Sequence, residues 1–524
     1  MKSIAFSSFS LIYILVLYIN QIKTEYVDLS FSKQEPIEVE DLCLRRPYHK
    51  TAEPYYFIPV LRSKLKEVGE KYSFPSRCFK KNIIIYKEIS KDKITLTLQN
   101  FNKTDTFCSE LFFFHTSDHN YLQFVAFQGE HNIVLKRITQ DDKDEIKING
   151  IKLYSFCSSF INTIKSVLKT FKAFYGGLGL DPNAKNPKFR PTLQKDVEKA
   201  NLRILELFNH YTPERRKNNT IVNIDKNIVK SGDAILISRM DGLDPMIMIG
   251  SGGRAGHTCV CSWFDGELYV LESQDAWYWP RHGIQKNKWD DWIQWAHNAD
   301  FNVVLLPLKE EYRQKLDVDK ANSWFNNEVE GLPYGYHNFI FTWIDTTTKN
   351  FPFITTHEFV ELVFSFLSKI YPKGSDLIIT EALNLRLGKK GLTFQQTVVE
   401  AARQGKTFEE LIAMPELEEY EYHDGLNYVC GCFVAAYYEH GGLFGDITIL
   451  PNEFTPRDIY TLDIFDKEFK KPQECIDDNP DLPYCQLMGK FILELDNYST
   501  IKPYNHMNER CPSQGPDFIR EEGC

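Results

Sequence analysis

The segment Ala255–Asp275, AGHTCVCSWFDGELYVLESQD, constrains the fold more than any other part of this 524-residue chain. Short runs of β-forming residues flank Asp265-Gly266, a dipeptide typical of two-residue hairpin turns. If this dipeptide forms the turn, Phe264 lies opposite Glu267, and the two flanking runs pair as antiparallel strands. The segment therefore predicts a β-hairpin.

This pairing brings several chemically active side chains to one face of the hairpin. Side chains alternate between the two faces of a strand, and those on one face touch directly or diagonally. The shared face holds His257, Cys259, Cys261, Glu272 and Gln274. A catalytic imidazole needs a partner that fixes its tautomer and ring angle, and Glu272 or Gln274 could supply it.

A second segment, NYVCGCFVAAYYEHGG, predicts a helix that begins after 427–429 and ends at Gly441-Gly442. Cys430 then lies at the helix N-terminus, where free N–H groups and the helix dipole favour a thiolate. The N–H of Gly431 or Cys432 could hold an oxyanion. Helical spacing places Cys430 on the face that packs against the sheet and Cys432 roughly opposite. Cys430 is therefore the predicted nucleophile, and Cys432 is the alternative.

The order of these motifs resembles the circularly permuted papain-like cysteine hydrolases. That superfamily includes the YiiX-like amidases and the lecithin:retinol-acyltransferase-like enzymes, and it is related to the NlpC-type peptidases. The resemblance covers about 225–450 and rests on SGDAILI, GHTCV, VLES, GLPYGYHNF and VCGCFVAAYY, with the histidine before the cysteine as in the permuted order. It implies that Cys430 is the nucleophile, His257 the general base and Glu272 the third polar residue.

The motif GLPYGYHNF adds two further candidates. The resemblance implies that Tyr334 lines the site or helps to bind an oxyanion, and the alternative is an aromatic core position. His337 is a second candidate base, although a lone histidine among aromatic residues is more often packed in a core. The tryptophans at 289, 292 and 295 recur at helical spacing and are predicted to be core residues.

The chain as a whole is predicted to be α+β. A permuted papain-like domain, with an antiparallel sheet packed on the cysteine-bearing helix, follows a small β-rich domain, and a cysteine-containing tail comes last. The predicted divisions are a signal peptide at 1–24, a β-sandwich or barrel at 25–157, a helical connector at 158–221, the papain-like domain at 222–465 with a helical insertion at about 356–420, and a disulfide-stapled tail at 466–524.

The first residues indicate the secretory route. Lys2 precedes an apolar run centred on 11–19, as in a signal peptide, and that run is short for a membrane span. A retained signal anchor is the alternative. We therefore expect a secreted protein or one in a lysosomal or vacuolar lumen, without a stable membrane span after cleavage. The glycosylation sequons at Asn102, Asn218 and Asn497 are consistent with this route.

The cysteines fall into three groups of four. The first and last groups suit disulfides in an oxidising compartment, with their pairing left open. They are Cys43, Cys78, Cys108 and Cys157, and Cys475, Cys485, Cys511 and Cys524. The middle group, Cys259, Cys261, Cys430 and Cys432, could bind a metal together with His257. Structural zinc sites usually use Cys-x2-Cys spacing, however, so we predict neither a metal nor another cofactor.

These features predict a thiol hydrolase of the peptidase or amidase type. Its Cys430–His257 dyad would form an acyl-enzyme on a peptide or on an acyl amide or ester. The net charge of −10 and the lack of a strong basic patch argue against nucleic acid as a partner. The alternative is a catalytically inactive papain-like domain that serves as a secreted binding module, because a fold does not establish a chemistry.

Overall fold

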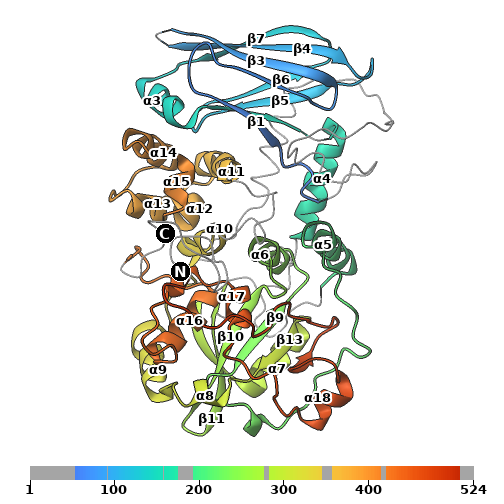
Figure 1. Ribbon diagram of the computed structural model, residues 1–524, viewed down its shortest axis with the longest axis vertical. Coiled ribbons are helices and arrows are strands. Elements are labelled where there is room, and N and C mark those ends of the chain that lie inside the picture. The colour runs from blue at the N-terminus through green and yellow to red at the C-terminus, as the bar shows by residue number, and fades with distance from the viewer. Residues whose placement is uncertain are drawn as a thin grey trace. The chain divides into compact units, whose positions relative to one another are not determined.

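The computed structural model describes residues 54–90, 92–156, 158–174, 193–275, 283–344, 357–414 and 420–507. The chain divides into two units, and it passes through each of them twice (Figure 1). The first unit comprises Met1–Phe171 and Phe353–Ile412, and the second comprises Lys172–Pro352 and Ala413–Cys524. The predicted signal peptide lies outside the described residues.

The first unit contains a β-sandwich. One four-stranded sheet has the order β1-β8-β5-β6 and the other has the order β2-β3-β4-β7. Both contribute to one apolar core, with Phe112 and Phe114 from the first sheet and Leu96 and Leu98 from the second. The described strands form no closed barrel. Their bounds are β1 (Val60–Leu65), β2 (Lys71–Phe74), β3 (Phe79–Ile89), β4 (Lys93–Lys103), β5 (Glu110–His115), β6 (Asn120–Val125), β7 (Gly129–Lys136) and β8 (Ile151–Ser155), and α3 (Gln140–Asn149) precedes β8.

The helical insertion belongs to this same unit. Leu362 packs against Phe113 and Tyr154 of the sandwich, and Glu361 forms an ion pair of 2.6 Å with Lys152 on β8. The insertion is therefore joined to the sandwich by both apolar and charged contacts. Its described elements are α11 (His357–Ile370), α12 (Pro372–Ser375), η4 (Asp376–Thr380), α13 (Glu381–Arg386), α14 (Phe394–Arg403) and α15 (Phe408–Ile412).

The second unit is built on a six-stranded antiparallel sheet with the order β12-β11-β10-β9-β13-β14. Its strands are β9 (Ala234–Ser238), β10 (His257–Phe264), β11 (Glu267–Gln274), β12 (Gly283–Lys288), β13 (Asn302–Leu306) and β14 (Cys485–Met488). Asp265 and Gly266 both have positive φ, 48° and 79°, as a type I′ turn requires. Phe264 pairs with Glu267, so the predicted hairpin and its register are confirmed.

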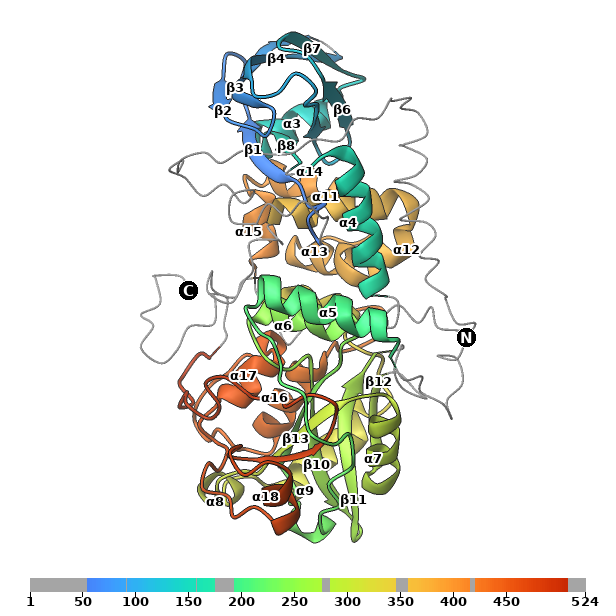
Figure 2. The ribbon, with the colours of Figure 1, turned by 90° about the vertical axis from the view of Figure 1, so that its right-hand side faces the viewer.

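Helices cover both faces of this sheet (Figure 2). Helix α7 (Trp289–Asn298) packs in the same core as Cys259 and Cys261 of β10. Helix α16 (Cys430–His440) packs on the opposite face, in the same core as Val260. The alternation of β10 side chains therefore separates two cores, and the mixed α+β class is confirmed.

Further helices complete the second unit. They are α5 (Lys195–Phe208), η1 (Lys226–Ile228), α6 (Leu243–Ser251), α8 (Glu310–Arg313), α9 (Val318–Trp324), η2 (Phe325–Val329), η3 (Tyr336–Asn338), α10 (Phe341–Ile344), η5 (Pro451–Glu453), α17 (Pro456–Thr461) and α18 (Gln473–Asp478). Helix α4 (Phe160–Ala173) lies at the sequence boundary between the two units. In the described part of the chain, no helix is both long enough and apolar enough to cross a membrane.

The C-terminal segment contributes directly to the sheet, because β14 pairs with β13. A disulfide between Cys475 and Cys485 closes the loop that precedes β14. In the sandwich, Cys78 is bonded to Cys108. Both bonds join cysteines within the groups predicted to form disulfides. The other members of these groups, Cys43, Cys157, Cys511 and Cys524, lie outside the described residues.

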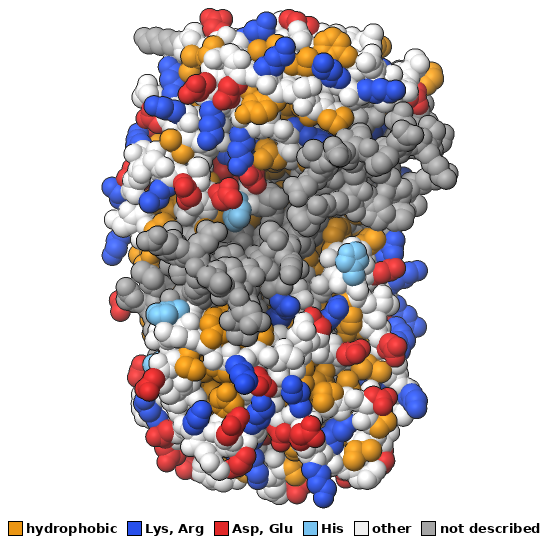
Figure 3. Space-filling view, viewed as in Figure 1, with side chains coloured by type: hydrophobic (Ala, Val, Ile, Leu, Met, Phe, Trp, Pro, Cys, Tyr) orange, Lys and Arg blue, Asp and Glu red, His pale blue; other side chains and the backbone are white. Residues whose placement is uncertain are grey.

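The face shown in Figure 3 carries charged side chains of both signs among polar and hydrophobic ones. Lys and Arg side chains are interspersed with Asp and Glu over the face shown in Figure 3. The three predicted glycosylation sites, Asn102, Asn218 and Asn497, are all exposed, which glycan attachment requires.

Candidate functional site

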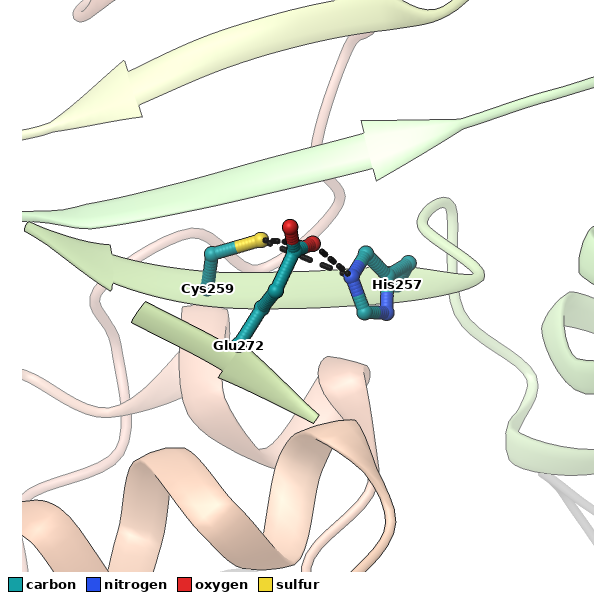
Figure 4. A group of neighbouring side chains, drawn as sticks. All are labelled: His257, Cys259 and Glu272. Atoms are coloured by element: carbon teal, nitrogen blue, oxygen red, sulfur yellow. Dashed lines mark hydrogen bonds and ion pairs between the residues drawn. The ribbon is translucent and has the colours of Figure 1, made fainter. Parts of the chain in front are cut away.

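His257 is the first residue of β10, and a carboxylate fixes its ring. The Nε2 atom lies 3.0 Å from Oε2 of Glu272, on the neighbouring strand β11 (Figure 4). The other oxygen of Glu272 accepts hydrogen bonds from Asn287 Nδ2 at 3.0 Å and from Trp292 Nε1 at 3.1 Å. Glu272 is therefore held from two sides, and it orients the imidazole as the hairpin register predicts.

Cys259 approaches the same ring nitrogen. Its sulfur lies 3.5 Å from His257 Nε2 and donates a hydrogen bond of 3.4 Å to Glu272 Oε2. Burial raises the pKa of the Cys259 thiol, and the charge of Glu272 raises it further. Cys259 is therefore a neutral donor in this cluster. The other ring nitrogen of His257 is turned away from both partners (Figure 4).

Cys430 is the first residue of α16, and its side chain interacts with the His257 imidazole. Burial lowers the pKa of His257, but the sulfurs of Cys259 and Cys430 outweigh burial and raise this pKa well above its usual value. Cys430 lies at a helix N-terminus, where free N–H groups and the helix dipole favour a thiolate. The fold thus brings together two residues that are more than 170 positions apart.

The local structure around Cys430 supplies free N–H groups. Val429 is extended, and the first helical hydrogen bond runs from the Phe433 N–H to the Val429 carbonyl at 2.9 Å. The N–H groups of the first turn, including that of Gly431, have no carbonyl acceptor within the helix. An added Cβ at Gly431 would lie 2.3 Å from the Phe454 carbonyl oxygen, so close packing there requires glycine.

Cys430 and His257 line one pocket of about 350 Å³, a volume that includes space open to solvent. The predicted residues Gln274 and Tyr334 line it as well. Gln274 Oε1 is buried and has no hydrogen-bond partner among the described residues. Burial raises the pKa of Tyr334 well above its usual value, so its hydroxyl remains protonated. Gln274 and Tyr334 therefore add an amide oxygen and a hydroxyl to the polar lining of the pocket.

Cys432 lies elsewhere. Its sulfur is 3.1 Å from the Asn452 carbonyl oxygen and 3.5 Å from Asn338 Nδ2, and its side chain is fully buried. Burial raises the pKa of this thiol well above its usual value. Cys432 does not line the pocket that holds His257. The structure thus separates the two cysteines that the sequence analysis weighs as nucleophiles.

A further polar group in the pocket escaped the sequence analysis. Asp244 is the second residue of the buried helix α6. Burial and the nearby Asp241 raise the pKa of its carboxyl, against the opposing effects of His257 and Arg239. An added Cβ at Gly256 would lie 2.5 Å from Asp244, so this glycine permits the close approach. Asp244 precedes the apolar run PMIMIG, which predicts a buried segment and gives no indication of a functional carboxyl. The only local indication was Gly256, directly before His257, because a glycine next to a site residue can mark the close approach of another segment.

Asn287 and Trp292 were also missed as functional residues. The spacing of the tryptophans predicts a core position, and Trp292 is indeed fully buried, but its indole N–H also donates to Glu272. Asn287 lies on β12 and donates to the same oxygen. Their shared partner is Glu272 on β11, and this contact becomes evident only from the packing of β12 and α7 beside β11.

This cluster also has the composition of a metal site. One ligand atom from each of His257, Cys259 and Glu272 lies within 4.8 Å of the others. Both oxygens of Glu272 already accept hydrogen bonds, and Cys259 is held as a thiol. These contacts favour a hydrogen-bonded cluster that orients His257.

Comparison with known proteins adds no family to this description, since no family model, curated protein or solved structure matches the chain. The resemblance to permuted papain-like hydrolases therefore rests on the sequence motifs. The geometry of Cys430, His257 and Glu272 has to be interpreted by its own chemistry.

Proposed function

We propose that this protein is a thiol hydrolase in which Cys430 is the nucleophile and His257 the general base. The observation that carries the proposal is the contact between the Cys430 thiol and the His257 imidazole inside one pocket. Glu272 holds the Nε2 nitrogen of this imidazole at 3.0 Å. A nucleophile, a base within reach of it and a group that orients the base are the three parts of a covalent-catalysis site.

The reaction follows from these positions. His257 accepts the Cys430 proton, and the thiolate attacks the carbonyl carbon of an amide or ester. The carbonyl oxygen becomes an oxyanion, which N–H groups of the first turn of α16, including that of Gly431, stabilise. The imidazolium then protonates the leaving amine or alcohol, whose bond to the carbonyl carbon breaks. Water, deprotonated by His257, releases the acid and restores the thiol.

The finer assignments belong to the same proposal. A permuted papain-like arrangement accounts for a histidine strand that precedes a cysteine helix and for a sheet packed between α7 and α16. Two disulfides and the sequence features of the N-terminus support a secreted protein or one in a lysosomal or vacuolar lumen. The substrate class is a peptide or an acyl amide or ester.

The test is covalent labelling of the full chain with a thiol-reactive, activity-based probe, followed by peptide mapping. Wild type should be modified at Cys430, Cys430→Ala should not react, and His257→Ala should react at least 100-fold more slowly, because general-base catalysis contributes roughly 10²–10⁴-fold. Cys432→Ala and Cys259→Ala are matched controls, and Cys432→Ala should retain the wild-type rate.

Two outcomes contradict the proposal. Labelling that survives Cys430→Ala but is lost in Cys432→Ala would move the nucleophile to the other cysteine. A folded wild-type protein that reacts no faster than denatured chain would favour the inactive binding module. Circular dichroism of each variant separates these outcomes from loss of folding.

A further inference from the structure

A second cluster of ligand-type side chains lies outside the pocket. It consists of His337, on η3, and of His423 and Asp424, in the turn before α16. One ligand atom from each residue lies within 4.8 Å of the others. Two imidazoles and one carboxylate form a set of donors typical of divalent transition-metal sites.

The turn that carries two of these residues is well defined. The Tyr422 N–H donates to the Gly425 carbonyl at 3.3 Å, and the Gly425 N–H returns a hydrogen bond of 3.1 Å to the Tyr422 carbonyl. Gly425 has a φ of 108°, a conformation that favours glycine. His423 and Asp424 therefore occupy the two central positions of a tight turn, where both side chains project from the same loop.

His337 meets this turn from the other side. Its ring is fully buried and stacks on the Tyr422 ring at 4.4 Å with an interplanar angle of 2°, and its centroid lies 5.4 Å from that of His423. The stacking holds the imidazole parallel to the Tyr422 ring and so fixes its plane. A buried ring held in this way is preorganised as a ligand.

The distance between His337 Nε2 and Asp424 Oδ1 is 3.4 Å. A charge-assisted hydrogen bond is shorter, about 2.7–2.9 Å. Tetrahedral zinc, with bonds of roughly 2.0–2.1 Å to nitrogen and oxygen, separates its ligand atoms by about 3.4 Å. The spacing of this pair therefore matches an edge of a zinc coordination sphere better than it matches a direct ion pair.

We propose that His337, His423 and Asp424 bind one Zn²⁺ ion, with water as the fourth ligand. Asp424 coordinates as the carboxylate and the histidines as neutral imidazoles. The site was not apparent from the sequence, which predicts no metal, because His337 is about 86 positions away from the turn. It does not depend on the proposed hydrolase activity.

The site would anchor the segment that leads into α16. The His337 N–H already donates to Asn427 Oδ1 at 3.1 Å, and the Gly335 N–H donates to the Tyr428 carbonyl at 3.2 Å. An added Cβ at Gly335 would lie 2.5 Å from the Tyr428 carbonyl carbon, so the two segments are closely packed. Zinc would add a third connection between them, six residues before the first residue of α16, and would stabilise the folded state.

The test measures metal rather than activity. The full chain is stripped with EDTA, dialysed against a small excess of Zn²⁺ and then against metal-free buffer, and its zinc content is determined by mass spectrometry. We expect one zinc per wild-type chain and a Tm raised by roughly 4 °C over the EDTA-treated protein. His423→Ala and Asp424→Asn should bind at least tenfold more weakly. Since His423 is exposed, its variant should retain the Tm of metal-free wild type.

Two further variants locate the metal. His257→Ala and His119→Ala alter the other two clusters of this kind among the described residues, and both should retain wild-type zinc. Cobalt substitution adds a spectroscopic control, because a site without cysteine lacks thiolate-to-cobalt charge-transfer absorption. The proposal is wrong if wild type retains no zinc, if His423→Ala binds as tightly as wild type, or if His257→Ala abolishes binding.

Discussion

Each unit of the molecule buries a cluster of ionisable side chains, and the two clusters differ in what surrounds the histidine. In the sandwich unit, Lys152 and Glu361 form a fully buried ion pair of 2.6 Å. Burial, together with the charge of Lys152, lowers the pKa of the adjacent His115 to about 3. In the second unit, His257 lies between a carboxylate and two sulfurs, and its pKa is raised well above its usual value.

This comparison shows that buried charge beside a pocket does not by itself indicate catalysis. A second pocket, lined by Lys152 and Glu361, lies in the first unit. No thiol lines it, and His115 stays neutral, so the cluster has a structural role in joining β8 to α11. The second unit adds a cysteine at a helix N-terminus within reach of a charged imidazole. That combination is the chemical difference between the two clusters.

The largest effect is expected from breaking the structural cluster. Lys152→Met removes the ammonium partner of the buried Glu361 carboxyl, so the free energy of unfolding should fall by about 3–5 kcal/mol. Urea denaturation measures it. The control is Lys64→Met, which removes a partly exposed ion pair of 2.6 Å with Glu358 and should cost about 0–1 kcal/mol. Equal losses in the two variants would contradict a structural role for the buried pair.

The next effect concerns the carboxylate that orients His257. Glu272→Gln preserves the side-chain shape but removes the charge 3.0 Å from Nε2, which disfavours the imidazolium. The rate of Cys430 labelling should fall about 100-fold at pH 6 and less at pH 9, where solvent hydroxide can also deprotonate the thiol. The same substitution in the other cluster, Glu361→Gln, should leave the labelling rate unchanged. A rate loss that does not vary with pH would indicate a packing defect instead.

How much of the fold and of the candidate site could be predicted from the sequence depends on how far apart in the chain the contacting residues lie. The hairpin register follows from the Asp265-Gly266 turn, because a two-residue turn fixes which residues face each other. The start of α16 at Cys430 follows from its composition and its terminal glycines. The position of Glu272 beside His257, on the neighbouring strand, could therefore be predicted from local sequence patterns.

Contacts between distant segments were not available from local rules. Asp244 reaches the pocket only because Gly256 permits the approach of α6, and His337 meets His423 only when two loops pack together. The assignment of the helical insertion to the first unit also depends on tertiary contacts, since Glu361 forms its ion pair with Lys152 on β8. Local patterns determine elements and register, whereas tertiary packing determines which elements share a site.

A smaller effect is expected from the buried carboxyl of the pocket. Because the pKa of Asp244 is raised in the folded state, the folded chain keeps this proton at pH values where the unfolded chain has lost it. The contribution of Asp244 to wild-type stability should therefore fall as pH rises above about 4, by about 1.4 kcal/mol for each pH unit over which only the folded state is protonated. Asp244→Asn cannot titrate, so its stability relative to wild type should increase from pH 4 to pH 6.

That pH window isolates Asp244 from His257. An unfolded histidine titrates near pH 6.5 and the folded His257 titrates higher, so His257 is charged in both states below pH 6. Urea denaturation at pH 4, 5 and 6 provides the measurement. A constant difference between wild type and Asp244→Asn across these three values would show that Asp244 is ionised in the folded protein.

The smallest effect separates the core role of Trp292 from its polar role. Trp292→Phe retains an aromatic ring in the core but removes the N–H that donates to Glu272 Oε1 at 3.1 Å. Asn287 still donates to that oxygen at 3.0 Å, so Glu272 should lose part of its orientation. We expect labelling of Cys430 to slow about tenfold, the equivalent of roughly 1.4 kcal/mol.

The matched control is Trp289→Phe on the same helix, which should reduce stability by a similar amount without slowing the reaction. If both variants slow labelling equally, α7 acts through packing alone, and the second hydrogen bond to Glu272 contributes nothing that distinguishes this cluster from the one around Lys152.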